Sequence, residues 1–303
     1  MALCLAIDVG GTKLAAGLVD DRGQVLAEQQ VPTPHEGDAE QVFATLAGLV
    51  DRIRADPRPD KATNSPGDAL VCCGVGCGGP MTSDTVSPLN IGAWRSFPLM
   101  SRLAESTGLP TFVDNDAKAL ALGEGWLGAA AGRRDYLAMV VSTGVGAGIV
   151  LDGRLLDGRT GNAGHIGHVV VVPDGRRCSC GGRGCLEAEA AGPAIAAVTG
   201  RPASEADQAV VARTGRLVGR AVASTANLLD LDLAVVAGSV ALGFGQPFFA
   251  AAQAELDALA CLDFSSGTSI VPAGLGRQGP LVGAAAVAWR AMAGAGAWPA
   301  HSS

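Results

Sequence analysis

Apolar residues at the start of the chain fall into three short runs separated by turns. Residues 3–8 form an apolar run that ends in an acid, a glycine turn occupies 10–13, and a second apolar run covers 14–19. A polar turn at 20–23 precedes a third run at 24–31. Short apolar segments joined by glycine-containing turns predict neighbouring antiparallel strands, so the chain is expected to open with a meander.

The same pattern occurs a second time near the middle of the chain. An apolar strand is predicted at 136–141, followed by a glycine turn at 142–146, a strand at 147–151, a turn at 152–153 and a short strand at 154–156. Two similar units, one in each half, indicate a duplicated α/β architecture: two α/β domains with an interdomain cleft between the copies.

The remaining segments alternate between helical and strand patterns. Helices are predicted at 40–55, 99–107, 117–127, 192–198, 205–229, 244–259 and 281–292, and strands at 69–75, 110–113, 233–237 and 269–272. Loops are predicted at 56–68 and 274–283, and the tail from 293 is expected to be unstructured. The duplication puts the domain boundary near residue 117. We therefore expect a small domain at 1–117, on which a helix at about 284–303 packs back, and a large domain at 118–283.

Composition excludes two classes of partner. The chain has 303 residues, 48% of them hydrophobic, and a formal net charge of −7. A chain without a basic excess is unsuited to nucleic acid, and its apolar runs are shorter than the roughly 20 residues that a membrane-spanning helix needs. The eight cysteines, in a chain whose start lacks the apolar core of a secretion signal, indicate a reducing cytoplasm.

The segment 161–187 concentrates potential metal ligands. Cys178, Cys180 and Cys185 have the C-x-C-x4-C spacing of a tight knuckle with intervening glycines, and His168 is close enough to be a fourth ligand. Three thiolates and one imidazole would complete a tetrahedral zinc shell with no open position, which is typical of structural zinc. A disulfide framework is the alternative, but it requires an oxidising compartment. His165 fits either a packing or a functional role.

The glycine turn at 10–13 follows Asp8 and can present backbone N–H groups and a hydroxyl to phosphate oxygens. A plain hairpin is the simpler interpretation of one such turn. Two features favour phosphate binding: Asp8 could hold a hydrated Mg²⁺, and the second turn at 142–146 would allow a clamp on a polyphosphate. The Walker A sequence is absent.

Three further polar residues could contact a sugar. Asn115 and Asp116 lie where a predicted strand meets a predicted helix, a position that also suits a plain helix cap. If a sugar hydroxyl lies there, Asp116 could accept its proton while a phosphoryl group arrives from ATP. Glu187 follows the last cysteine closely and could accept hydrogen bonds from a sugar, although a solvated surface acid is the alternative.

Five motifs together resemble the ROK family of sugar kinases and repressors, which has the actin-like ATPase (ribonuclease H-like) fold. They are IDVGGTK, DNDA, STGVGAG, GHIGH and CSCGGRGCLE, in the family's order. The resemblance implies that Asp116 is the catalytic base and that zinc is bound by His168, Cys178, Cys180 and Cys185. It implies sugar contacts from Asn90, Asn115, Asp116, His165, His168 and Glu187, nucleotide contacts from Asp8, Gly10, Gly11, Thr12, Lys13, Thr143, Gly144 and Gly238, and Mg²⁺ near Asp8, directly or through water.

The chain departs from the family pattern at one position. The usual motif is E-x-G-H, whereas His165 gives H-x-G-H. A carboxylate accepts hydrogen bonds from two hydroxyls, while a neutral imidazole offers one donor and one acceptor, so sugar recognition should change. The string AGHIGH is similar to that of bacterial N-acetylmannosamine kinases, but the tryptophan loop SPLNIGAWRSFPL is closer to family glucokinases.

The resemblance implies an ATP-dependent kinase that phosphorylates the 6-hydroxyl of a hexose or N-acylhexosamine, with glucose or N-acetylmannosamine as the leading substrates. The alternatives are a sugar-sensing regulator and a sugar-binding protein without catalysis. Family repressors carry a helix-turn-helix ahead of the first strand, for which residues 1–2 leave no room. Polyphosphate is a second possible donor. The resemblance also implies that the chain assembles into a homodimer or homotetramer.

Overall fold

The computed structural model describes residues 1–55 and 69–294 and divides into two compact units. The first unit comprises Met1–Leu127, Asp157–Ala163 and the C-terminal stretch from Arg277. The second comprises Gly128–Leu156 and Gly164–Gly276. The predicted loop at 56–68 and the tail from 295 lie outside the described residues.

The first unit contains a five-stranded sheet in the order β3-β2-β1-β4-β5. Its strands are β1 (Ala2–Val9), β2 (Lys13–Asp20), β3 (Val25–Pro32), β4 (Ala69–Cys77) and β5 (Thr111–Asn115). The first three strands are antiparallel, as the predicted meander requires, and β4 and β5 add to β1 in parallel. The carboxyl ends of β1, β4 and β5 therefore meet at one edge of the sheet.

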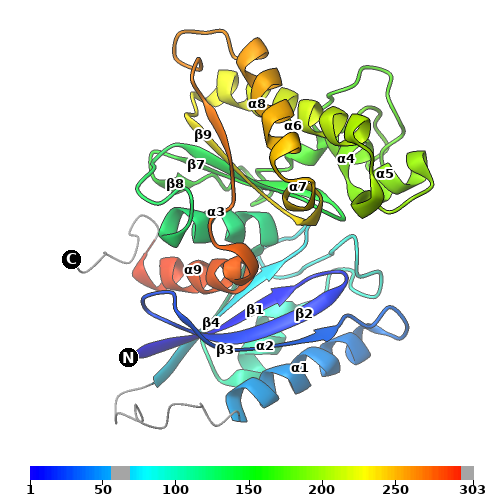
Figure 1. Cartoon of the computed structure of the whole chain (residues 1–303). Helices are drawn as coiled ribbons and strands as arrows, with labels where there is room; N and C mark the ends of the chain where they lie inside the picture. Colours follow the sequence, from blue (N-terminus) through cyan, green and yellow to red (C-terminus); the bar gives the residue numbers. More distant parts are fainter. Residues whose placement is uncertain (56–68, 295–303) are drawn as a thin grey trace. The chain divides into compact units, whose positions relative to one another are not determined.

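The described residues of the first unit contain four α-helices: α1 (Ala39–Ala55), α2 (Leu99–Thr107), α3 (Asp116–Leu127) and α9 (Gly279–Ala293). Helix α1 buries Leu46, Leu49 and Ile53, which have helical spacing along one face. Helix α9, red in Figure 1, lies beside α3 and against β1, β4 and β5. Gly74 of β4 allows this packing, because a Cβ there would lie 2.0 Å from the carbonyl oxygen of Ala284.

The second unit repeats the first sheet. Its strands are β6 (Tyr136–Val141), β7 (Val145–Leu151), β8 (Arg154–Leu155), β9 (Leu233–Ala237) and β10 (Ser269–Pro272). Their order is β10-β9-β6-β7-β8, with three antiparallel strands and two that are added in parallel. The predicted duplication of an α/β unit is confirmed at the level of strand order and direction.

The helices of the second unit are α4 (Leu186–Ala190), α5 (Gly192–Thr199), α6 (Gln208–Leu229), α7 (Ser239–Phe244) and α8 (Gln246–Leu259), with short 3-10 turns η2 (Ile166–His168) and η3 (Ala203–Glu205). Helices α6 and α8 pack closely through glycine. A Cβ on Gly215 or Gly219 would lie 2.4 Å or 2.3 Å from the carbonyl oxygen of Phe248 or Ala252. No helix in the described residues is both long enough and apolar enough to cross a membrane.

Two element predictions need correction. The helix predicted at 244–259 is split between α7 and α8 by Gly245, whose φ of 61° and ψ of −150° exclude it from a helix. The loop predicted at 274–283 ends early, because α9 begins at Gly279 after the 3-10 turn η4 (Gly276–Gln278). Gly283 is inside that helix, where a Cβ would meet the carbonyl oxygen of Ala119 at 2.5 Å. Close packing of α9 on α3 explains this glycine.

The division into units differs from the boundary predicted near residue 117. Helix α3 belongs to the first unit because it packs against α9 and β4. The segment 157–163 also belongs to the first unit. There the ammonium group of the buried Lys118 donates to a carboxylate oxygen of Asp157 at 2.7 Å and to the carbonyl oxygen of Gly161 at 3.1 Å. The side chain of Asn162 exchanges hydrogen bonds with the backbone of Met81.

Candidate active site

The residues predicted to act in the first unit gather at the carboxyl edge of its sheet. Asp8 lies near the end of β1 opposite Gly76 of β4, and Asn115 ends β5 opposite Cys77. A Cβ on Gly76 would come within 3.9 Å of Asp8 Oδ1 and 3.7 Å of the Cα of Asp116. Position 76 thus lies beside both Asp8 and the start of α3.

The first glycine turn connects β1 to β2 and is held by backbone and side-chain contacts. The N–H of Gly10 donates to the carbonyl oxygen of Lys13 at 3.0 Å. Thr33 donates its hydroxyl to the carbonyl oxygen of Gly10 at 2.7 Å and its N–H to that of Thr12 at 3.0 Å. The buried Thr33, which the sequence patterns did not single out, therefore fixes the shape of this turn.

Asn90 packs against this turn. A Cβ on Gly11 would lie 2.4 Å from the Cβ of Asn90, so only glycine fits at position 11 with Asn90 in place. This contact places one predicted sugar-binding residue directly beside the predicted phosphate turn, within the first unit.

Asn115 and Asp116 form the start of helix α3. The N–H of Ala117 donates to Asn115 Oδ1 at 3.0 Å and to Asp116 Oδ1 at 2.8 Å, so both side chains help to cap the helix. The cap does not exclude chemistry, because a carboxylate has a second oxygen and the Asp116 side chain is exposed. Asp116 is thus held in place by the helix start while remaining accessible to a substrate.

The carboxyl group of Asp8 has a strongly shifted pKa. Burial and, to a lesser extent, the nearby negative charge of Asp116 raise the pKa, Lys13 opposes them, and the net result is a pKa of about 7. Two neighbouring carboxyl groups at one sheet edge, with Asp8 half-buried, form an acidic site that a cation would stabilise. Perturbed carboxyl groups of this kind are typical of functional sites.

The second glycine turn, at 142–146 between β6 and β7, is contacted by several predicted site residues. Glu187 Oε2 accepts a hydrogen bond from the N–H of Val145 at 2.9 Å. The hydroxyl groups of Ser142 and Ser239 lie 2.9 Å apart. Ser239 directly follows Gly238, which has a φ of 101° and lies so close to β6 that a Cβ would be 2.3 Å from the carbonyl oxygen of Val141. Thr143, Gly144, Gly238 and Glu187 are therefore neighbours in the second unit.

The histidine-containing segment runs along β7. The N–H of Ala147 donates to the carbonyl oxygen of Gly164 at 2.9 Å. A Cβ on Gly167 would lie 2.2 Å from the carbonyl oxygen of Val145. The two glycines of GHIGH thus let this segment lie against the strand that follows the second turn, with His165 and His168 on either side of the first residues of η2.

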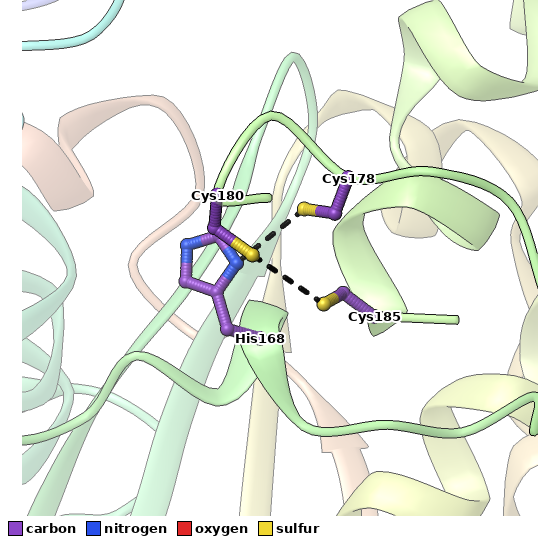
Figure 2. A group of neighbouring side chains, drawn as sticks. All are labelled: His168, Cys178, Cys180 and Cys185. Atoms are coloured by element: carbon purple, nitrogen blue, oxygen red, sulfur yellow. Dashed lines mark hydrogen bonds between the residues drawn. The ribbon is translucent and has the colours of Figure 1, made fainter. Parts of the chain in front are cut away.

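His168, Cys178, Cys180 and Cys185 form a compact group of donor atoms that all lie within 4.8 Å of one another. His168 Nδ1 is 3.6 Å from Cys178 Sγ, and Cys180 Sγ is 3.7 Å from Cys185 Sγ (Figure 2). With Zn–S bonds of about 2.3 Å, two thiolates of a tetrahedral site lie about 3.8 Å apart. The donor types and their spacing therefore fit a closed zinc shell.

The backbone around the cysteines forms the expected knuckle. The N–H of Cys178 donates to the carbonyl oxygen of Gly182 at 2.9 Å, and the N–H of Gly181 donates to the carbonyl oxygen of Cys178 at 3.0 Å. Gly181 and Gly184 have φ values of 92° and 70°, which favour glycine. All eight cysteines are free thiols, so the disulfide alternative is wrong for this structure.

The two histidines differ in their surroundings. His168 is half-buried and directs Nδ1 to the cysteine sulfurs, whereas His165 is exposed. Their rings are stacked with centroids 5.9 Å apart. Because Nδ1 of His168 faces the sulfurs, its Nε2 is the atom left for a ligand. His165 adds a second imidazole next to it.

Comparisons with known proteins identify similar sequences. The model of the ROK family matches residues 4–291. The N-acetylmannosamine kinase of Citrobacter koseri is 38% identical over 256 residues, which cover 80% of this chain and 84% of that protein.

Solved structures give the same result for the fold. A ROK family glucokinase from Streptomyces griseus, solved with glucose and AMPPNP, has a TM-score of 0.79 and 30% identity, covering 94% of this chain and 99% of that one. The ROK hexokinase from Thermus thermophilus has a TM-score of 0.77 and 33% identity, covering 96% and 99%. The predicted α/β actin-like ATPase fold is thereby confirmed.

Proposed function

The chain belongs to the ROK family, and we propose that it transfers the γ-phosphoryl group of ATP to the 6-hydroxyl of N-acetylmannosamine. The coarser activity, that of a sugar kinase, follows from the relatives that share most of the chain, which are kinases of N-acetylmannosamine, glucose and hexose. The choice among these sugars depends on the residues that line the sugar site.

The choice of N-acetylmannosamine as the proposed sugar rests on His165. The exposed imidazole offers one donor and one acceptor at a position where the family's glucokinase pattern has a carboxylate. An N-acyl group presents one N–H and one carbonyl oxygen in place of a hydroxyl. An imidazole therefore suits an N-acylhexosamine better than a carboxylate does, since a carboxylate only accepts hydrogen bonds.

The tryptophan loop, which favoured glucose, has a structural explanation. The Trp94 ring is fully buried and stacks on Phe97 with centroids 4.5 Å apart. Its indole N–H donates to the carbonyl oxygen of Ala39 at 3.1 Å. Trp94 packs in the core between this loop and α1. Its presence is therefore explained by packing in the first unit and does not indicate which sugar binds.

Asp116 is proposed as the catalytic base. Its exposed carboxylate, held at the start of α3, would accept the proton of the 6-hydroxyl while the hydroxyl oxygen attacks the γ-phosphorus. The bond between the γ-phosphorus and its bridging oxygen then breaks, and ADP leaves. Asn115, which shares the cap, and Asn90 would hold other hydroxyls of the sugar.

The two glycine turns are proposed to bind the nucleotide. Gly10, Gly11, Thr12 and Lys13 would supply backbone N–H groups, a hydroxyl and an ammonium group to phosphate oxygens. Thr143, Gly144 and Gly238 would do so from the second unit. The carboxyl group of Asp8 would hold Mg²⁺, directly or through water. Magnesium neutralises the charge that develops on the transferred phosphoryl group.

Zinc is proposed as a structural ion of the second unit, bound by His168 Nδ1 and the thiolates of Cys178, Cys180 and Cys185. A bound zinc would supply rigidity rather than chemistry, because this ligand set leaves no open position. Cys185 immediately precedes α4, which carries Glu187. Zinc would therefore fix Glu187 and His168, both proposed to hold the sugar together with His165.

A coupled assay of ADP release tests this function. The purified chain is supplied with N-acetylmannosamine, glucose, mannose or N-acetylglucosamine and with ATP as donor. Because transfer from polyphosphate releases no ADP, the sugar phosphate formed with ATP or with polyphosphate is also quantified directly by mass spectrometry. We expect the highest kcat/KM for N-acetylmannosamine with ATP. A higher kcat/KM for glucose would overturn the choice of sugar, and turnover with polyphosphate alone would overturn the choice of donor.

The same assay separates the kinase from a sugar-sensing regulator. A regulator would bind sugar without releasing ADP. Sugar binding measured by calorimetry, together with a turnover below about 0.01 s⁻¹, would therefore favour a regulator, since typical enzymes turn over at about 10 s⁻¹.

We also propose that the chain forms a homodimer or homotetramer and acts in the cytoplasm on small molecules only. Light scattering after size-exclusion chromatography measures the assembly.

A further inference from the structure

The second unit contains a cavity of about 580 Å³ that the proposed kinase reaction does not use. It is lined by the loop that contains Val172 and Arg176, by α5 and by α6, and none of the residues predicted for the active site is among its described lining. Its volume is in the range of sites for small organic ligands. We call it the arginine pocket, after the three arginines that line it, Arg176, Arg183 and Arg213.

Two arginines of the arginine pocket share one carboxylate. Arg213 Nη2 donates to Glu189 Oε2 at 2.6 Å, and Arg176 Nη2 donates to the same oxygen at 2.8 Å. The backbone N–H of Arg176 donates to Glu189 Oε1 at 2.8 Å. Burial would raise the pKa of Glu189, but the hydrogen bonds from Arg176 and Arg213 outweigh it and lower the pKa to about 2. One negative charge is thus shared by two guanidinium groups, which leaves an excess positive charge.

The side chains of Arg176 and Arg213 remain partly exposed. The side chains of Arg176 and Arg213 are 32% and 42% exposed, whereas that of Glu189 is 2% exposed. Arg213 uses Nη1 and Nη2 on Glu189, and its Nε–H has no hydrogen-bond acceptor among the described residues. Arg183, also exposed, makes only a long 3.4 Å contact to the carbonyl oxygen of Gly175 within the described part of the chain. Guanidinium donors therefore remain for a ligand. The exposed Asp174 is the one other acid that lines the pocket.

Four apolar residues also line the arginine pocket. Ile195 and Val198 come from α5, Val210 from α6 and Val172 from the loop. Val198 is 63% exposed, which is high for a valine in a helix with an otherwise apolar sequence. Guanidinium groups and apolar side chains in the lining of one cavity match a ligand that has both a negative group and a hydrocarbon part.

We propose that the arginine pocket binds a small organic anion with a carboxylate or phosphate head and a short apolar body. Arg213 and Arg183 would bind the head, because guanidinium groups form paired hydrogen bonds with carboxylate and phosphate oxygens. Val198 and Ile195 would contact the body. The chain's net charge of −7 makes a local positive excess unnecessary for solubility, which favours a binding role for these arginines.

Calorimetry on the full chain without ATP or sugar tests this site. The probes are hexyl phosphate, hexanoate, inorganic phosphate and the neutral hexanol. We expect hexyl phosphate or hexanoate to bind at least tenfold more tightly than inorganic phosphate and hexanol, and the better of the two identifies the head group. No binding of either anion at 10 mM, or equal binding of inorganic phosphate, would overturn the proposal.

Three variants locate the binding. Arg213→Gln removes one guanidinium group. Val198→Glu places a negative charge among the apolar lining residues and leaves all three arginines unchanged. Both should weaken binding of the preferred anion at least tenfold. Arg216→Gln is the matched control, because Arg216 is an exposed arginine of the same helix α6 outside the pocket. If Arg213→Gln does not fold, Val198→Glu decides alone, and unchanged binding in that variant would show that the anion binds elsewhere and overturn the proposal. Failure of the kinase assay would not affect this result.

Discussion

Glu187 Oε2 accepts a 2.9 Å hydrogen bond from the backbone N–H of Val145, so a predicted sugar ligand also holds the second glycine turn. The contact is tight, since a Cβ on Gly144 would lie 3.0 Å from the same oxygen. The knuckle, the start of α4 and the turn proposed to bind phosphate are therefore connected through one carboxylate. Glu187 is thus suited to two roles, one toward the sugar and one toward the nucleotide.

Two substitutions separate these roles of Glu187. Glu187→Gln keeps an oxygen that can accept from Val145 but removes the negative charge, whereas Glu187→Ala removes both. We expect both variants to raise KM for the sugar, and only Glu187→Ala to raise KM for ATP, by about three- to tenfold for the loss of one hydrogen bond. Steady-state kinetics with each substrate varied in turn measures this. An unchanged KM for ATP in Glu187→Ala would show that the turn does not need Glu187.

Replacement of Asp116 by asparagine should lower kcat by about 10²- to 10⁴-fold, the range that a general base contributes. Asparagine has an oxygen that can still accept from Ala117, so the helix start should be kept. Sugar affinity, measured by calorimetry, should change little. Turnover within tenfold of the wild-type value would exclude Asp116 as the base.

Replacement of Cys180 by serine should remove one thiolate from the cluster and release zinc. The metal content of the purified protein, measured by mass spectrometry, should fall from about one zinc per chain to well below one, and the thermal midpoint should fall with it. Cys261→Ser is the matched control, because Cys261 is also exposed but lies outside the cluster. Equal zinc content in the two variants would contradict the assignment of the cluster.

His165→Glu should shift sugar preference toward glucose. A carboxylate accepts from two hydroxyls but cannot donate to an acyl oxygen, so kcat/KM for N-acetylmannosamine relative to glucose should fall by at least tenfold. His35→Glu makes the same chemical change at another exposed histidine and should leave the ratio unchanged. An equal ratio in His165→Glu and the wild type would mean that His165 does not select the sugar.

Stability at acidic pH should depend on Glu189. The pKa of Glu189 is lowered to about 2 in the folded protein, below its ordinary value of 4.5, so its contribution is fully present above about pH 4.5 and is lost as the pH falls toward 2. A shift of this size corresponds to roughly 3 kcal/mol. Urea unfolding should show a stability difference between wild type and Glu189→Gln that narrows over this range.

The control for Glu189→Gln is Glu205→Gln, at an exposed glutamate that does not line the arginine pocket. Its stability should follow that of the wild type at each pH. If the difference between wild type and Glu189→Gln were the same at pH 6 and pH 3, ionisation of Glu189 would not stabilise the fold.

Most strands could be predicted well because they are buried apolar runs bounded by turns. Residues 136–141, 233–237 and 269–272 were predicted with the observed bounds. Two helix boundaries were missed at segments that contain a glycine. Gly245 breaks a helix through its positive φ, while Gly283 lies inside one, and the local sequence does not distinguish these two uses of glycine.

The candidate site was predictable where motifs are contiguous, and less so where partners are distant in sequence. The turns, the cysteine knuckle and the helix start at Asp116 each carry a local pattern. Thr33, which holds the first turn, and the pairing of Lys118 with Asp157 have none, because each depends on contacts between residues more than twenty positions apart. The assignment of α3 and residues 157–163 to the first unit likewise depends on contacts between segments distant in sequence.

The position of α9 has a consequence for the order in which the chain can fold during synthesis. Strands β1 to β5 are made first, but the helix that packs on β1, β4 and β5 is the last described element to be made. Most of the second unit, by contrast, lies between residues 164 and 276. We therefore expect the N-terminal sheet to complete its core only after the second unit has been synthesised.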